Sequence, residues 1–128
     1  MFYDKISGYE SVVTYAFDDS DRAYILMYSL NNIANESCIT AYNNLKYALS
    51  QKYGEPQSDE VNKRYTYTEE EWHQVYYGNL SYEANWITDD FVNITLKLTT
   101  FSNSISCTIR YVYLPLLMLQ QEKEQANL

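Results

Sequence analysis

The stretch VNITLKLT, residues 92–99, alternates strictly between apolar and polar side chains. Successive side chains of a β-strand point to opposite faces, so this pattern predicts a strand with one buried and one exposed face. The stretch SISCTIRYVY, residues 104–113, repeats the alternation and places its apolar side chains at every second position from Ile105 to Tyr113. Two such strands in succession predict an antiparallel sheet that is covered on a single face.

Three further runs extend the predicted sheet. One run alternates at Tyr82, Ala84 and Trp86 before a polar turn at 88–90. The runs SVVTYAF (11–17) and RAYILMYSL (22–30) flank the polar turn DDSD. Two β-prone runs around a short polar loop predict a hairpin. Val13, Tyr15 and Phe17 share one face of its first strand, whereas the second run is apolar almost throughout and does not reveal its inner face. We therefore expect about five antiparallel strands.

A long helix is expected over residues 36–53. Asn35 or Ser37 can cap its start, and Gly54 and Pro56 predict its end near Tyr53 because glycine adopts the left-handed conformation and proline cannot continue a helix. Its apolar side chains recur at helical spacing on one face, at Cys38, Tyr42, Leu45 and Leu49.

The remaining segments predict smaller elements. Residues 55–64 are interpreted as a polar loop and residues 64–68 as a possible short strand. Thr68 and Glu71 match a capping box, which predicts a short helix over 69–77. Pro115 favours the start of a C-terminal helix, so residues 115–128 are expected to form a helix or a tail. The predicted fold is one α+β domain over 1–128, in the order β-β-α-α-β-β-β, with helices on one sheet face.

Composition limits the possible partners. The net charge of −8 disfavours nucleic acids and anionic membranes, and no apolar run reaches transmembrane length. The 15 tyrosines, against four phenylalanines, suit a half-buried sheet first and a binding surface second. The N-terminus lacks a leader pattern, so the chain is expected to be cytoplasmic if Met1 is the true start, and secreted or lipid-anchored if a leader was removed.

No combination of residues predicts catalysis, a metal site or a cofactor site. His73 is the single histidine, without a nucleophile nearby in the sequence. Cys38 and Cys107 have no metal-ligand spacing, and they are interpreted as small core residues, with a disulfide as the alternative. The aspartates at 18–21 are more typical of a turn than of a calcium loop. We therefore expect no enzyme activity.

Two binding hypotheses follow. The first is a non-enzymatic protein-binding or assembly module that uses the open side of the sheet or the apolar cluster Leu116, Leu117, Met118 and Leu119, with self-association possible. The second is a small-molecule or ion-binding module with an aromatic cavity between helix and sheet. We expect this cavity to be lined by four side chains, Tyr42, Trp72, Trp86 and Tyr111.

Four strings carry a family resemblance: VTYAF at 13–17, LSQKYGEP at 49–56, WIT at 86–88 and ITLKL at 94–98. Together they resemble small bacterial domains of unknown function that are often secreted or lipid-anchored. That group is similar in layout to β-lactamase-inhibitor-protein-like folds and to small outer-membrane assembly lipoproteins. The resemblance implies helices packed on one face of an antiparallel sheet, and binding rather than catalysis.

Overall fold

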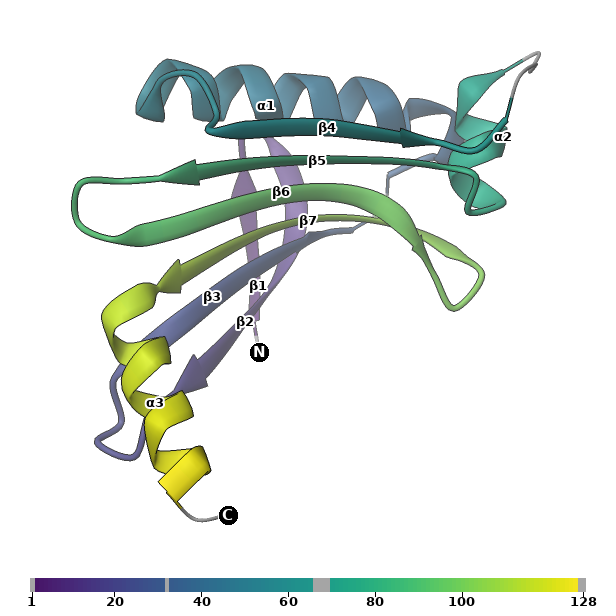
Figure 1. Ribbon diagram of the computed structural model, residues 1–128. Coiled ribbons are helices and arrows are strands. Elements are labelled where there is room, and N and C mark those ends of the chain that lie inside the picture. Colours follow the sequence, from purple (N-terminus) through teal and green to yellow (C-terminus); the bar gives the residue numbers. More distant parts are fainter. Residues whose placement is uncertain (1, 32, 66–69, 127–128) are drawn as a thin grey trace.

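The computed structural model describes residues 2–31, 33–65 and 70–126, which form one seven-stranded antiparallel sheet and three α-helices (Figure 1). The strand order is β1-β2-β3-β7-β6-β5-β4. The strands are β1 (Phe2–Ile6), β2 (Tyr9–Phe17), β3 (Ala23–Leu30), β4 (Ser58–Lys63), β5 (Leu80–Ile87), β6 (Val92–Phe101) and β7 (Ser104–Tyr113). The helices are α1 (Cys38–Tyr53), α2 (Glu71–Tyr76) and α3 (Leu114–Ala126), and a 3₁₀ turn, η1 (Asn35–Ser37), precedes α1. The predicted α+β class with an antiparallel sheet is confirmed.

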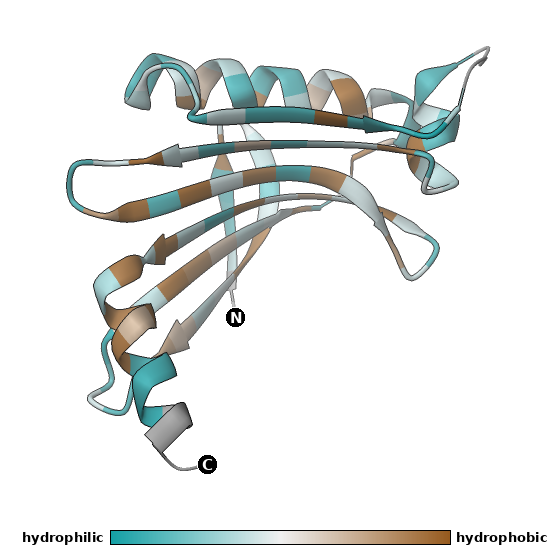
Figure 2. Cartoon of the chain, in the orientation of Figure 1, coloured by the Kyte–Doolittle hydropathy of each residue, from teal (hydrophilic) through white to brown (hydrophobic). Residues whose placement is uncertain are grey.

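The predicted number of about five strands is wrong, because the two edge strands, β1 and β4, were not predicted from the alternation of apolar and polar residues. β4 has the sequence SDEVNK, which carries charges on both faces and is largely hydrophilic in Figure 2. An edge strand needs only one neighbour, and charges there discourage pairing with other chains. The segment interpreted as a loop at 55–64 therefore contains a strand. Arg64 and Tyr65 lie outside it, while residues 66–69, including Thr68 of the predicted capping box, lie outside the described residues.

The side chains that α1 covers define what we call the inner face of the sheet. Directly paired residues of an antiparallel sheet point to the same face. Val13, Ile109 and Leu96 belong to one such cross-strand row and are fully buried. Leu96 and Ile109 pack in one cluster with the predicted helix face, of which Tyr42, Leu45 and the other members are all buried. The alternation read from β6 and β7 thus places the core correctly.

Opposite edges of the sheet reach the same helix. At one edge, Asp59 of β4 forms an ion pair with Lys46 of α1. Toward the other edge, Asn44 Nδ2 of α1 donates a hydrogen bond of 2.8 Å to the Tyr9 hydroxyl of β2. Figure 1 accordingly shows β4 beside α1, with β1 and β2 rising behind the helix. The sheet is therefore curved around α1, and the inner face is its concave side.

The helices do not all lie on one face, which corrects the prediction. Val112 points to the outer face, because it pairs with Ile25 and Asn93 rather than with core residues, yet it is only 2% exposed. α3 begins directly after β7 and contacts β3 and β7, so we place α3 over this part of the outer face. Figure 1 shows α3 well away from α1.

The ends of α1 partly match the prediction. Ser37, one of the two predicted caps, occupies the N-cap position but makes no side-chain capping hydrogen bond, and Asn35 lies within η1. The helix ends at Tyr53 as predicted. Gly54 has a positive φ of 87°, and its N–H donates to the Ser50 carbonyl at 2.9 Å.

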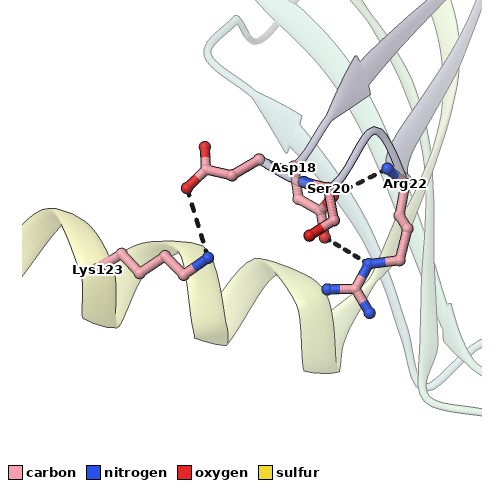
Figure 3. A network of polar contacts seen from close by, with 5 residues as sticks. Asp18, Ser20, Arg22 and Lys123 are labelled. Carbon is pink, nitrogen blue, oxygen red and sulfur yellow. Dashed lines mark hydrogen bonds and ion pairs between the residues drawn. The ribbon is translucent and has the colours of Figure 1, made fainter.

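The turn between β2 and β3 is organised by one aspartate (Figure 3). Asp18 Oδ1 accepts hydrogen bonds of 2.9 Å from the backbone N–H groups of Ser20 and Arg22, and Oδ2 accepts one of 2.8 Å from Arg22 Nε. In the same turn, Asp19 Oδ2 lies 3.4 Å from Lys123 Nζ of α3. Asp18 therefore acts as a turn residue, and the neighbouring ion pair ties the turn to the C-terminal helix.

The Asp18 contacts predict a loss of stability in acid. The Arg22 N–H first, then the Ser20 N–H and the Arg22 charge, hold the pKa of Asp18 below its usual value against the opposing effect of burial. A lowered folded-state pKa stabilises the protein above the unfolded pKa of about 3.9, and this stabilisation disappears as the pH falls through the folded value. Asp18→Asn should therefore lose less stability than the wild type between neutral and strongly acidic pH. Urea midpoints over that range measure this, with Asp21→Asn as the charge-matched control; parallel curves for wild type and Asp18→Asn would refute the assignment.

Candidate functional site

α1 covers only part of the inner face. Exposure rises along the strands with distance from the helix: Val13 is fully buried, Tyr15 is 42% exposed and Phe17 is 57% exposed, although all three share one face of β2. On β7, Ile109 is buried, Tyr111 is half-buried and Tyr113 is 40% exposed. The inner face therefore continues beyond the helix as an uncovered surface.

We call this uncovered part the aromatic face. Its rings are packed against one another: those of Tyr15 and Phe17 lie 5.9 Å apart, and Tyr111 meets Tyr28 edge-to-face at 6.1 Å. Such neighbours hold each other in fixed positions, which lowers the entropy that a partner would have to remove. The members of the aromatic face are Tyr15, Phe17, Tyr24, Leu26, Val92, Tyr111 and Tyr113.

Three surface hollows meet at Tyr111. The largest, about 440 Å³, lies beside the β5–β6 turn, and we call it the turn cavity. A second of about 150 Å³, the strand cavity, lies over the start of β3 and shares Val92 and Tyr111 with the first. A third of about 170 Å³ lies between α1, the β1–β2 turn and Tyr111. Because Tyr111 lines all three, the hollows lie next to one another around this side chain, and we call the three together the depression.

The polar groups of this depression favour hydrogen bonding over proton transfer. Burial raises the pKa of Tyr111 to about 12, with smaller contributions from the neighbouring Tyr53 and Tyr28. Burial also raises the pKa of Tyr28, assisted by the negative charge of Asp4 and by Tyr15, while Lys52 acts in the opposite direction. These hydroxyls stay protonated at neutral pH, so each can donate one hydrogen bond and accept others.

The rim of the turn cavity is held by backbone contacts. Thr88 Oγ1 accepts a hydrogen bond of 3.2 Å from the Val92 N–H, and the Phe91 N–H donates to the Thr88 carbonyl at 3.0 Å. The Phe91 carbonyl in turn accepts from the Leu114 N–H at 3.0 Å, which links the turn to the start of α3. Phe91 has a left-handed φ of 63°, and its ring is exposed. The turn thus presents Asp89, Asp90 and an aromatic ring from a fixed backbone.

The four residues expected to line a cavity between helix and sheet are not brought together around open space. Tyr42 and Trp86 are each 1% exposed and belong to the closed core. Trp72 is half-buried on α2, and its Nε1 donates to Glu70 Oε2 at 2.5 Å. Tyr111 is the member that borders the three hollows described above. The hollows therefore gather around Tyr111, and not around Tyr42 and Trp86 as the sequence suggested.

The apolar cluster of α3 is divided between packing and solvent. Leu116 and Leu117 are half-buried, whereas Met118 and Leu119 are exposed. The cluster therefore helps to dock α3 and also leaves two apolar side chains on the surface. Single exposed apolar side chains are common on folded proteins and need no partner to explain them.

The cysteines and the histidine occupy structural positions. Cys38 and Cys107 are both unbonded and buried, as the core interpretation expected, and burial raises the pKa of Cys107 to about 12. Burial also raises the pKa of the Cys38 thiol. His73 packs its ring 4.0 Å from that of Trp72. Within residues 2–31, 33–65 and 70–126, no group of three or more His, Cys, Asp or Glu side chains is arranged to hold a metal ion.

Comparison of the chain with models of protein families, with curated proteins and with solved structures gives no match. No helix in the described parts of the chain combines the length and the apolar character needed to cross a membrane. The function is therefore argued from the chain's own residues.

Sequence reasoning did not find the aromatic face. It placed Tyr15 and Phe17 on the same side as Val13, which is correct, but it did not predict that Tyr15 and Phe17 would lie uncovered beyond the helix. It also looked for a partner surface on the open, outer side of the sheet. Near β4 to β6 that side is polar: Thr95 Oγ1 donates to Asn85 Oδ1 at 2.7 Å, and Asn85 Nδ2 donates to Ser58 Oγ at 3.0 Å. The available signal was the number of tyrosines that shared a face with core residues.

Proposed function

We propose that this protein is a non-enzymatic binding module that holds a protein partner on its aromatic face. The main observation in support is that the inner face extends from a closed core to the exposed rings of Phe17 and Tyr113. α1 does not cover these rings. Contiguous exposed apolar surface on a soluble domain is typical of an interaction site. Tyrosine suits such a site because its ring buries apolar area while its hydroxyl stays hydrogen-bonded.

The chemistry of the depression supports binding rather than catalysis. Tyrosine hydroxyls such as that of Tyr111, with its raised pKa, are poor bases and poor nucleophiles at neutral pH. The buried thiols of Cys38 and Cys107 are likewise held protonated. The resemblance to small bacterial domains with a β-lactamase-inhibitor-protein-like layout favours the same conclusion.

A small-molecule ligand is the second candidate. The turn cavity, at about 440 Å³, falls within the range of roughly 300–1,000 Å³ that is typical of small-molecule sites. It combines apolar walls, such as Val92 and Ile94, with the polar groups of Thr88 and Asp89. An aromatic or cationic molecule would suit this lining, and it would compete with a protein partner for the same surface.

Matched surface variants test the proposed face. Phe17→Ser/Tyr113→Ser removes two exposed rings of the aromatic face, whereas Tyr3→Ser/Tyr47→Ser removes two exposed rings elsewhere. Used as immobilised baits, the wild type and the control should retain the same proteins. The first variant should retain them at least about tenfold more weakly, since interface aromatics commonly contribute more than 1 kcal/mol each. Equal capture by all three baits would count against this face, and similar melting temperatures would exclude misfolding as the cause.

A further inference from the structure

We propose that the segment bound by the aromatic face is basic and apolar: a lysine or arginine enters the turn cavity, and a neighbouring apolar side chain enters the strand cavity. This inference rests on the proposed function and adds the chemistry of the partner. The inference follows from the charges around the turn cavity, from the two side chains that line both hollows and from the net charge of the chain.

The turn cavity combines two features that attract a cation. Asp89 and Asp90 line it with carboxylates, and within the described residues neither is engaged in an ion pair. Tyr53 and Tyr111 also line it, and the faces of tyrosine rings attract ammonium and guanidinium groups through their quadrupoles. A lysine or arginine side chain could pack its apolar stem against these rings while its charged end meets the carboxylates.

The adjoining strand cavity favours an apolar side chain. It is lined by the backbone and side chains of the first residues of β3 together with Val92, Tyr111 and Tyr113, and none of its lining residues carries a charge. Val92 and Tyr111 belong to both hollows, so a ligand that fills one necessarily borders the other. An extended peptide points successive side chains in opposite directions, which allows a residue and its second neighbour to occupy adjacent hollows.

The electrostatic balance of the depression is negative. Lys52 is the basic group there, and its Nζ already lies 5.2 Å from the centre of the Tyr53 ring. Asp89 and Asp90 of the turn cavity outnumber this lysine among the residues that line the depression. The chain as a whole carries a charge of −8. A cationic partner would be attracted over the distance that screening allows, whereas an acidic one would be repelled.

The same charge argues against a second copy of this chain as the occupant. Each copy carries a net charge of −8 and would bring its own Asp89 and Asp90 to the contact, and like charges that face each other across an interface are destabilising. Self-association through the aromatic face is therefore treated as an outcome that would overturn the inference.

A synthetic peptide series provides the probes. The acetylated and amidated peptide Gly-Leu-Ser-Lys-Ser-Leu-Gly carries the proposed chemistry, because its lysine has a leucine as second neighbour on each side. Analogues with Gln or Glu in place of Lys remove or reverse its charge. The full chain, labelled with ¹⁵N, is titrated with each peptide and followed by two-dimensional NMR. We expect shifts at the amides of Val92, Tyr111 and their neighbours. The Lys peptide should bind at least about tenfold more tightly than the Glu peptide, with an advantage that shrinks as salt is added.

Charge variants locate the cation. Asp89→Asn/Asp90→Asn should weaken the Lys peptide by about threefold to tenfold, the range for two partly exposed charge pairs, and should leave the Gln peptide unchanged. Glu36→Gln/Glu60→Gln removes the same charge at exposed positions on η1 and β4 and should leave both affinities within about twofold.

The outcomes separate this inference from the proposed function. If the Lys and Gln peptides bind the aromatic face equally, or if Asp89→Asn/Asp90→Asn has no effect, the basic partner is refuted while the binding face stands. If the Lys peptide shifts amides elsewhere or none at all, the inference is again overturned, and the bait comparison alone decides the proposed function. If sedimentation shows that the wild type is a dimer and that Phe17→Ser/Tyr113→Ser is a monomer, the occupant of the aromatic face is a second copy of the chain.

Discussion

Replacing Trp86 by alanine is expected to lower the free energy of unfolding by about 3–5 kcal/mol, the usual cost of removing a large buried aromatic side chain. Trp86 is 1% exposed in the core, opposite Ile94 in the neighbouring strand. Its Nε1 also donates a hydrogen bond of 2.8 Å to the Gly54 carbonyl at the end of α1. The alanine variant would therefore create a cavity and leave a helix-end carbonyl without its donor.

Two further substitutions divide this effect. Trp86→Phe keeps most of the ring but loses the donor, and we expect a loss of about 1–3 kcal/mol from the unmade hydrogen bond and imperfect packing. Trp72→Ala removes the half-buried tryptophan and should cost less than Trp86→Ala, because less apolar area leaves contact. Urea denaturation followed by circular dichroism measures all three without depending on tryptophan fluorescence. A cost for Trp86→Ala no greater than that for Trp72→Ala would contradict the assignment.

The parts of the fold that followed from the sequence are those in which one face dominates. Residues 92–98 and 105–113 alternate because one side of each strand meets the core and the other meets solvent or polar neighbours. α1 could also be predicted, because its buried side chains recur at helical spacing and Gly54 ends the helix. In each case local propensity and tertiary burial act in the same direction, which is the condition under which pattern reasoning succeeds.

The edge strands could not be found in this way. β4 pairs only with β5, and its side chains are mostly exposed on both faces, so no alternation is required of it. β1 has only five residues, too few to show a clear alternation, and it pairs only with β2. Main-chain hydrogen bonds hold such strands in place, and every residue except proline can make those bonds.

The aromatic face depends on a geometric mismatch that sequence alone does not display. α1 has 16 residues and is thus about 24 Å long. The seven strands span roughly 29–34 Å across the sheet at their usual spacing, and a strand of ten residues is itself about 33 Å long. One helix cannot cover an area of that size, even on a concave face. With about five strands predicted, nothing in the sequence indicated that the inner face would extend beyond the helix at Tyr15 and Phe17.

The abundance of tyrosine now has a specific explanation. Tyr42, in the core, has a hydroxyl that makes no hydrogen bond among the described residues, whereas Tyr28 and Tyr111 lie at the border of the core and Tyr113 lies beyond it. A residue with an apolar ring and a polar tip can occupy every step of this gradient. Tyrosines therefore occur along the inner face from the closed core to the exposed aromatic face, and the end of α1 marks the boundary between the two.

That boundary should be sensitive to Gly54. Its φ of 87° and ψ of −168° lie in a region open almost solely to glycine. A Cβ added there would meet nothing within 4 Å, so the cost of Gly54→Ala is one of backbone conformation, about 1–3 kcal/mol. If the backbone instead relaxes, the Gly54 carbonyl moves away from Trp86 Nε1, and the end of the helix at Tyr53 shifts over the turn cavity.

Gly54→Ala should therefore combine a loss of stability with weaker binding of the Lys peptide. Gly8→Ala provides the control, because Gly8 also has a positive φ, 83°, and open space at its Cβ, but it lies in the β1–β2 turn. We expect Gly8→Ala to lower stability by about 1 kcal/mol and to leave peptide affinity unchanged. Urea denaturation and the same NMR titration measure both properties. If Gly54→Ala were as stable as the wild type, Gly54 would not be needed to end α1, and the helix end would not define the border of the aromatic face.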